Sequence, residues 1–134
     1  LDATSGRSVR TIDGSRLNKI TYSPDGRLLV TASSGSGLVR LLDAASGAEL
    51  QTLTHGADVY GLAFSPDGET LATAGTDSAV RLWDVATGEE RAALTGHLHE
   101  ICGVAFSPDG HTLATGSSDR TIRLWRAATP QEAR

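Results

Sequence analysis

The sequence has very little cysteine, lysine or aromatic residue, and it has no long apolar run. Its single cysteine, Cys102, excludes an intrachain disulfide framework. No stretch of apolar residues is long enough to cross a membrane. Lys19 is the only lysine, and 16 acidic against 12 basic residues give a formal net charge of −4. Because this balance indicates no phosphate-binding surface, we expect a cytoplasmic protein whose partners are neither nucleic acid nor membrane.

A repeat of constant length runs through the chain. The tetrapeptide Ser-Pro-Asp-Gly recurs with a spacing of 42 residues, at Ser23–Gly26, Ser65–Gly68 and Ser107–Gly110. The later segments RLL, RLW and RLW align in the same register. A fixed period of this length is the sequence sign of a repeat architecture. We predict three repeats, at approximately residues 1–42 (degenerate), 43–83 and 84–126, followed by a polar tail or linker at residues 127–134.

Each repeat has the pattern of four short β-strands joined by tight turns. In the third repeat we predict strands at residues 89–94, 101–106, 111–116 and 121–125. The last pair alternates with period two and contains β-branched and aromatic residues, as half-buried strands do. In the Ser-Pro-Asp-Gly segment, proline favours the first corner of a turn and glycine supplies the positive φ that follows. No segment has helical periodicity, so the predicted fold is all-β with antiparallel hairpins.

The period, a Gly-His step, an aspartate six residues before a tryptophan and the ending RLWD together resemble the WD-repeat (WD40) β-propeller family. The resemblance implies blades of four antiparallel strands, each held by a buried structural tetrad of His, Ser or Thr, Asp and Trp. The matching residues are His55, Thr73, Asp77 and Trp83 in the second repeat, and His97, Thr115, Asp119 and Trp125 in the third. Such donors and acceptors stabilise a fold as a unit, whereas a hydrolase needs an exposed nucleophile and an oxyanion site. We therefore expect no catalytic residues.

The first repeat departs from this pattern. Asp13 stands at the histidine position, Leu42 replaces the tryptophan, and only Thr31 remains of the tetrad. The glycine-rich segment Ser33–Gly37 contains no aspartate, and we interpret it as a loosened hairpin turn. The first blade is therefore expected to be the least rigid of the three.

Three blades do not close a propeller, which usually has about 4–8. The sequence ends after the third strand of the last blade, and each end of such an arc exposes an apolar face. The sequence also lacks an initiator methionine and a signal peptide. Two explanations stay open: the chain is part of a larger propeller, or identical chains complete a ring as a homo-oligomer.

Propellers of this family are mostly platforms for other proteins, which bind around the central channel. The positions that match the family's contact surface are Arg16, Asn18, Asp58, Tyr60, Thr76, Glu100, Cys102 and Ser118. Tyr60 is the strongest single candidate because tyrosine is typical of binding hot spots, although packing along the inner strand is the alternative. Asp58 and Glu100 favour a basic peptide, unless they are ordinary solvated charges.

Two hypotheses of function follow. The first is a non-catalytic scaffold whose rim binds a protein or peptide. The alternative is a regulatory or sensing propeller domain of a multidomain signalling enzyme, such as a kinase, a protease or a nucleotide-binding ATPase. We expect no cofactor. A metal site is not expected either, because His97 belongs to the tetrad, and His99 with Glu100 provides too few ligands.

Overall fold

Three antiparallel sheets follow one another along the chain. The structure is a computed structural model, and it describes residues 17–126. The first sheet has the strand order β1-β2-β3-β4, the second β5-β6-β7-β8, and the third β11-β10-β9. The strands are β1 (Leu17–Tyr22), β2 (Leu28–Ser33), β3 (Leu38–Asp43), β4 (Glu49–Thr54), β5 (Val59–Phe64), β6 (Thr70–Gly75), β7 (Val80–Asp84), β8 (Glu90–Leu94), β9 (Ile101–Phe106), β10 (Thr112–Ser117) and β11 (Ile122–Arg126). No helix occurs in this part of the chain, which confirms the predicted all-β fold.

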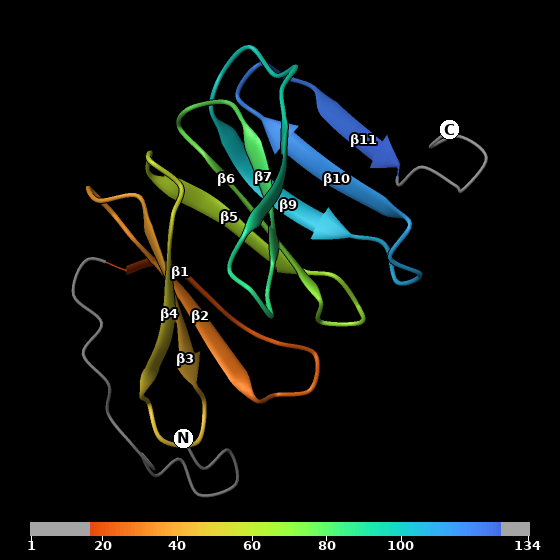
Figure 1. Ribbon diagram of the computed structural model, residues 1–134. Coiled ribbons are helices and arrows are strands. Elements are labelled where there is room, and N and C mark those ends of the chain that lie inside the picture. Colours follow the sequence, from red (N-terminus) through yellow and green to blue (C-terminus); the bar gives the residue numbers. More distant parts are fainter. Residues whose placement is uncertain (1–16, 127–134) are drawn as a thin grey trace, which may run out of the picture.

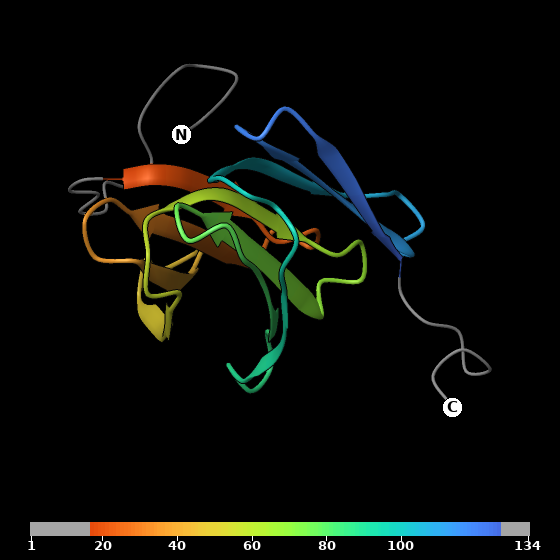
Figure 2. The ribbon, with the colours of Figure 1, turned by 90° about the horizontal axis from the view of Figure 1, so that it is seen from above.

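The sheets are arranged as consecutive blades. Figure 1 shows them side by side in chain order, from the orange first sheet through green to the blue third sheet. The innermost strands β1, β5 and β9 are neighbours, and Figure 2 shows the same succession from above. The strand predicted at residues 89–94 is β8, and it is the outermost strand of the second blade. The sequence repeat is therefore offset from the structural blade by one strand.

The hydrophobic core lies between the blades. Between the first two blades, Val39 and Leu41 pack with Leu71 and Trp83. Between the second and third, the core residues are Ala72, Ala74, Val80, Ile101 and Leu113. Because each blade buries its apolar face against the next, the arc leaves apolar side chains exposed on its end blades. On the first blade Tyr22 is 63% exposed, and on the third Leu124 is 72% exposed.

The three Ser-Pro-Asp-Gly turns are built alike. In the first, the Ser23 hydroxyl donates to Asp25 Oδ1 (2.6 Å), which also accepts the Arg27 N–H (2.9 Å). The Gly26 N–H donates to the Ser23 carbonyl (2.9 Å), and Gly26 has a φ of 74°. The other two turns repeat these bonds at equivalent residues. Each turn therefore fixes the innermost hairpin of its blade with its own side chains.

Candidate functional site

In the second blade, four side chains form one hydrogen-bonded chain. The indole N–H of Trp83 on β7 donates to Oγ1 of Thr73 on β6 (2.9 Å). The Thr73 hydroxyl donates to Nδ1 of His55 (2.8 Å), and the Nε2–H of that ring donates to Asp77 Oδ1 (3.0 Å). His55 follows β4 and Asp77 lies in the β6–β7 turn. These hydrogen bonds therefore connect the end of the first blade to two strands and a turn of the second.

The third blade contains the same set of hydrogen bonds, but the imidazole of His97 is flipped, so that its two ring nitrogens have exchanged partners. Trp125 donates to Thr115 Oγ1 (3.0 Å). Here Nε2 of His97 faces Thr115 (2.7 Å) and Nδ1 faces Asp119 Oδ2 (2.8 Å). The tautomer that donates to the carboxylate is therefore the Nδ1–H form in the third blade and the Nε2–H form in the second.

The two hydroxyls are inaccessible to a substrate. Thr73 is completely buried and Thr115 is 1% exposed. Each accepts an indole N–H and meets an imidazole nitrogen, so its polar capacity is satisfied within the protein. A nucleophile has to be exposed beside an oxyanion site. The geometry of these residues therefore suits joining strands rather than attacking a substrate.

The side chain of Asp119 is more deeply buried than that of Asp77, and it accepts several hydrogen bonds. Its side chain is only 4% exposed, against 26% for Asp77. It accepts the Thr121 hydroxyl, His97 Nδ1–H, and the backbone N–H groups of Leu98 (3.0 Å) and Thr121 (2.8 Å). These hydrogen bonds, that from the Thr121 hydroxyl first among them, hold the pKa of Asp119 far below its ordinary value.

Several other aspartates are also stabilised in the charged form. The serine hydroxyls and then the backbone N–H groups of the Ser-Pro-Asp-Gly turns lower the pKa of Asp25, Asp67 and Asp109. Arg91 lowers the pKa of Asp84 through a side-chain hydrogen bond. In each case the folded protein binds the proton less tightly than the unfolded chain.

Stability is therefore expected to fall in acid. A carboxyl group whose pKa is depressed by folding contributes stability above its unfolded pKa of about 4, and this is lost as the pH falls through the folded pKa. The melting temperature should therefore drop as the pH falls below about 4, as measured by circular dichroism. A melting temperature that rises on acidification below about pH 4 would contradict this assignment.

The glycine-rich turn of the first blade is not loose, contrary to the sequence interpretation of Ser33–Gly37. The Gly35 N–H donates to Asp58 Oδ1 at 2.6 Å. Gly37 is buried with a φ of 67°, and a Cβ on it would lie 2.7 Å from the backbone nitrogen of Ala57. The segment is held by the second blade, whose loop after β4 lies against it. This contact between blades could not be read from the repeat itself.

Two predicted rim residues connect the first and second blades. The Asn18 side chain on β1 donates to the Val59 carbonyl at 3.4 Å. The Asp58 carboxylate accepts the Gly35 N–H, so part of its acceptor capacity is used inside the protein. Both side chains are half-buried. Arg16, the remaining rim residue of the first repeat, and Asp13 lie outside the described residues.

Three predicted rim residues of the third blade come together. The Ser118 hydroxyl lies 3.3 Å from Glu100 Oε1 and 3.5 Å from Cys102 Sγ. These residues lie at the exposed surface of the blade. On the second blade, Tyr60 is half-buried at the start of β5 and Thr76 is exposed in the β6–β7 turn. The exposed polar cluster and Tyr60 therefore lie on the adjacent inner strands of neighbouring blades.

Sequence reasoning missed the role of the arginine in the RLL and RLW segments. Arg81 Nε donates to the His55 carbonyl (3.1 Å), and its Nη1 donates to Glu90 Oε1 on β8 (2.6 Å). The hydrogen bond from Arg81 to Glu90 raises the pKa of Arg81 above its ordinary value. At the equivalent position of the first blade, Arg40 Nε forms a longer ion pair with Glu49 Oε1 on β4 (3.7 Å). The recurrence of arginine at this position in the repeats was the sequence signal from which this role could have been predicted.

Residues 17–126 contain no convergent group of three His, Cys, Asp or Glu side chains suited to a metal ion. None of the described segments is a helix of the length and hydropathy that a membrane span requires.

Successive antiparallel sheets, packed face to face and tied at equivalent positions by His, Thr, Asp and Trp, define blades of a β-propeller. The sequence model of the family described as "WD domain, G-beta repeat" (WD40) matches residues 6–43, 47–84 and 88–126. The chain belongs to the WD40 family.

Two solved structures resemble this chain closely in fold. They are the structure of U3-55K, with a TM-score of 0.83, and that of the RRP9 WD40 repeats, with a TM-score of 0.82. Each is 23% identical, and the match covers 87% of this chain but 38% of the solved chain. The chain thus spans less than half the length of these two proteins, and identity at this level shows the fold alone. No curated protein matches the sequence.

Proposed function

We propose that this chain is a non-catalytic scaffold of cytoplasmic complexes, whose rim binds a protein or peptide. The observation that carries the proposal is the cluster of Glu100, Cys102 and Ser118, which lies exposed at the start of β9 beside the β10–β11 turn. Tyr60 occupies the matching place at the start of the adjacent strand β5. Tyrosine is enriched among binding hot spots, which supports a role for Tyr60 in this surface.

The charge of this surface favours a basic partner. Glu100 is exposed, and its carboxylate is engaged only by the neutral hydroxyl of Ser118 among the described side chains. Asp58 already accepts a backbone N–H, so Glu100 is the stronger anchor for a lysine or arginine of the partner. A charge-assisted hydrogen bond at this point would be stronger than a neutral one.

The double variant Tyr60→Ala with Glu100→Ala is expected to weaken partner binding at least about tenfold without unfolding the protein, because it removes the aromatic anchor and the charge. Peptides selected on the wild-type protein from a random display library provide the ligands, and titration calorimetry measures their affinity. The matched control is Tyr22→Ala with Glu69→Ala, which removes a tyrosine and a glutamate near the opposite ends of the strands. Undiminished binding by the Tyr60 and Glu100 variant would refute this surface.

A further inference from the structure

Each Ser-Pro-Asp-Gly turn contains an Asp-Gly bond, and glycine has no side chain to shield its backbone nitrogen from a reaction with the carboxyl group before it. The glycine nitrogen attacks Cγ of the aspartic acid, a C–N bond forms, and the carboxyl hydroxyl leaves with the amide proton as water. A second water then opens the cyclic succinimide. When it breaks the bond between that nitrogen and the former main-chain carbonyl carbon, the product is isoaspartate, in which the chain continues through Cγ. The Asp67–Gly68 bond lies in the middle of the three described blades.

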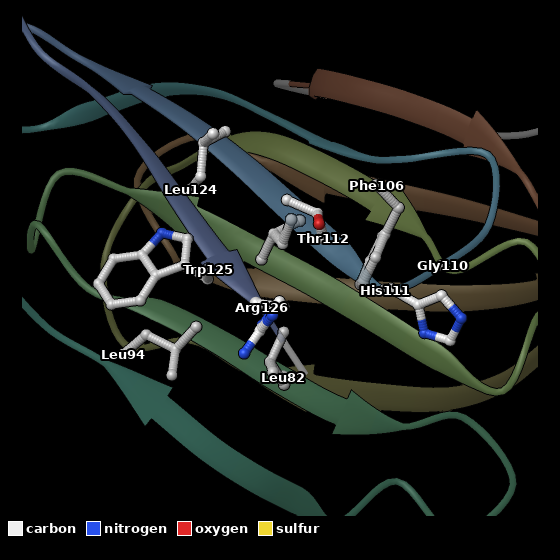
Figure 3. A pocket seen from close by; sticks show the side chains of 10 residues that line it. Leu82, Leu94, Phe106, Gly110, His111, Thr112, Leu124, Trp125 and Arg126 are labelled. Atoms are coloured by element: carbon white, nitrogen blue, oxygen red, sulfur yellow. The ribbon is translucent and has the colours of Figure 1, made fainter. Parts of the chain in front are cut away.

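Water has access to these turns. Asp67 is exposed, and with Gly68 and Pro24 it lines a cavity of about 330 Å³ between the turns of the first two blades. In the third turn, Gly110 and His111 lie at the end of a groove of about 340 Å³ (Figure 3). Exclusion of water therefore does not protect the Asp-Gly bonds, and any protection has to come from the geometry of the turn.

The hydrogen bonds of the turn engage both reacting groups. The Gly68 N–H donates to the Ser65 carbonyl at 2.8 Å, and this bond is lost in the succinimide because its nitrogen has no proton. Asp67 Oδ1 accepts the Ser65 hydroxyl (2.5 Å) and the Glu69 N–H (2.9 Å). These two bonds, that from the Ser65 hydroxyl first, also lower the pKa of Asp67, whereas only a protonated carboxyl group can lose its oxygen as water. The closed turn therefore opposes the reaction at the nitrogen and at the carboxyl group.

The neighbouring blade also lies against the glycine of each turn. A Cβ on Gly68 would lie 3.6 Å from Cδ of Pro24, and a Cβ on Gly110 would lie 3.3 Å from Cδ of Pro66. The proline ring of one turn therefore packs against the glycine of the next. Because a turn opens only locally and at a cost in free energy, the Pro24 ring of the first blade restricts the movement that frees the Gly68 nitrogen.

We propose that Asp67–Gly68 is a latent site of isoaspartate formation, which the folded turn suppresses and which reacts when the turn opens and the first two blades separate.

The modification would have a lasting effect on the blade. In isoaspartate the main chain passes through Cβ and Cγ, so the turn gains a backbone atom between Pro66 and Gly68. The Gly68 N–H then no longer meets the Ser65 carbonyl in the geometry of the native turn. A blade that has opened for long enough to react therefore cannot form the original contact with Pro24 again.

The test compares the complete 134-residue chain with the peptide of residues 62–70 (LAFSPDGET), which contains the same Asp-Gly bond without the blade. Both are incubated near neutral pH in water enriched in the heavy oxygen isotope, because each passage through the succinimide introduces one such oxygen. Fragment-resolved mass spectrometry then measures the incorporation at Asp67. The rate in the folded chain should be at least about tenfold lower than in the peptide, because only the opened turn reacts.

The Ser65→Ala variant tests the hydrogen bonds of the turn. It removes the hydroxyl that Asp67 accepts, but it leaves the third turn intact. The rate at Asp67 should rise at least about threefold. Asp109 of the same molecules is the internal control, and its rate should remain that of the wild-type protein.

The Pro24→Ala variant tests the contact between the blades. It removes the ring that packs against Gly68, and it should raise the rate at Asp67 by about twofold or more. The matched control is Pro108→Ala, which removes the proline of the third turn. It should leave the rate at Asp67 unchanged, because the ring beside Gly68 is that of Pro24.

Three results would overturn the proposal. The first is an equal rate at Asp67 in the folded chain and in the peptide. The second is a Ser65→Ala protein in which Asp67 reacts no faster, or in which Asp67 and Asp109 accelerate equally, as global unfolding would cause. The third is an unchanged rate in Pro24→Ala, which would remove the role of the blade contact even if Ser65→Ala does not fold.

Discussion

Replacing Asp119 with alanine is expected to lower the free energy of unfolding by about 3 kcal/mol, because hydrogen bonds to a charged group contribute about 1.5–3 kcal/mol and the substitution leaves the N–H of the buried His97 ring without its acceptor. The side chain is 4% exposed and accepts the His97 ring N–H and the Thr121 hydroxyl. Without it, His97 keeps its bond to Thr115 but loses the group that fixes its tautomer. Urea denaturation monitored by tryptophan fluorescence measures the change.

Two control variants separate the tetrad from ordinary turn effects. Asp109→Ala removes an exposed carboxylate that also accepts a hydroxyl and a backbone N–H, and it should lower stability clearly less than Asp119→Ala does. Ser36→Ala, in the exposed part of the first blade's turn, should change stability by less than about 0.5 kcal/mol. If Asp119→Ala and Ser36→Ala had equal effects, the tetrad would not be a unit of stability.

The same reasoning ranks the two tetrads. Asp77 is 26% exposed, and a rearranged side chain or water can replace it more easily than it can replace Asp119. Its partner Arg81 is also held independently by Glu90. Asp77→Ala should therefore be intermediate between Asp119→Ala and Asp109→Ala.

The blades and the tetrads were predictable because each depends on residues close in sequence or fixed by the repeat. Ser65, Asp67 and Gly68 build their turn from local hydrogen bonds, and the other two copies of the tetrapeptide reverse the chain in the same way. The spacing of His55, Thr73 and Trp83 is reproduced 42 residues later, so one interpretation served both copies. When every repeat of a fold depends on the same short-range interactions, the structure of all repeats can be predicted from the sequence of one.

The contacts between blades were not predictable in this way. Asp58 was predicted as a rim residue from its position in the repeat, but the hydrogen bond that its carboxylate accepts from the Gly35 N–H of the first blade was not predicted. Gly37 was interpreted as part of a loosened turn, but it is pressed against the backbone of Ala57. A repeat gives the residues at equivalent positions, but not the distance and rotation between neighbouring blades. Those follow from how Val39, Leu41 and Trp83 fill the space between sheets.

Replacing Gly75 with alanine is expected to lower the free energy of unfolding by about 3 kcal/mol, at the upper end of what overpacking usually costs. A Cβ on Gly75 would lie 1.7 Å from the Asp58 carbonyl oxygen and 2.9 Å from Cα of Val59. Both atoms belong to the backbone at the start of β5, and the Thr76 N–H donates to that same carbonyl at 2.9 Å. To relieve this steric overlap, the β5 and β6 backbones have to separate. They would do so at a place where the second blade is also hydrogen-bonded to the first.

Gly116 provides the matched control, because a Cβ on it meets nothing within 4 Å. Gly116→Ala should be neutral or stabilising by about 0.5 kcal/mol, since alanine restricts the unfolded chain more than glycine does.

In the third blade the residue equivalent to Gly75 is Ser117, whose hydroxyl donates to the Glu100 carbonyl at 2.8 Å. If the second blade could widen to the geometry of the third, Gly75→Ser would gain that bond and approach wild-type stability. Thermal melts of the three variants decide between a rigid and an adaptable second blade, and a Gly75→Ala protein as stable as Gly116→Ala would show that the close approach at Asp58 is not required.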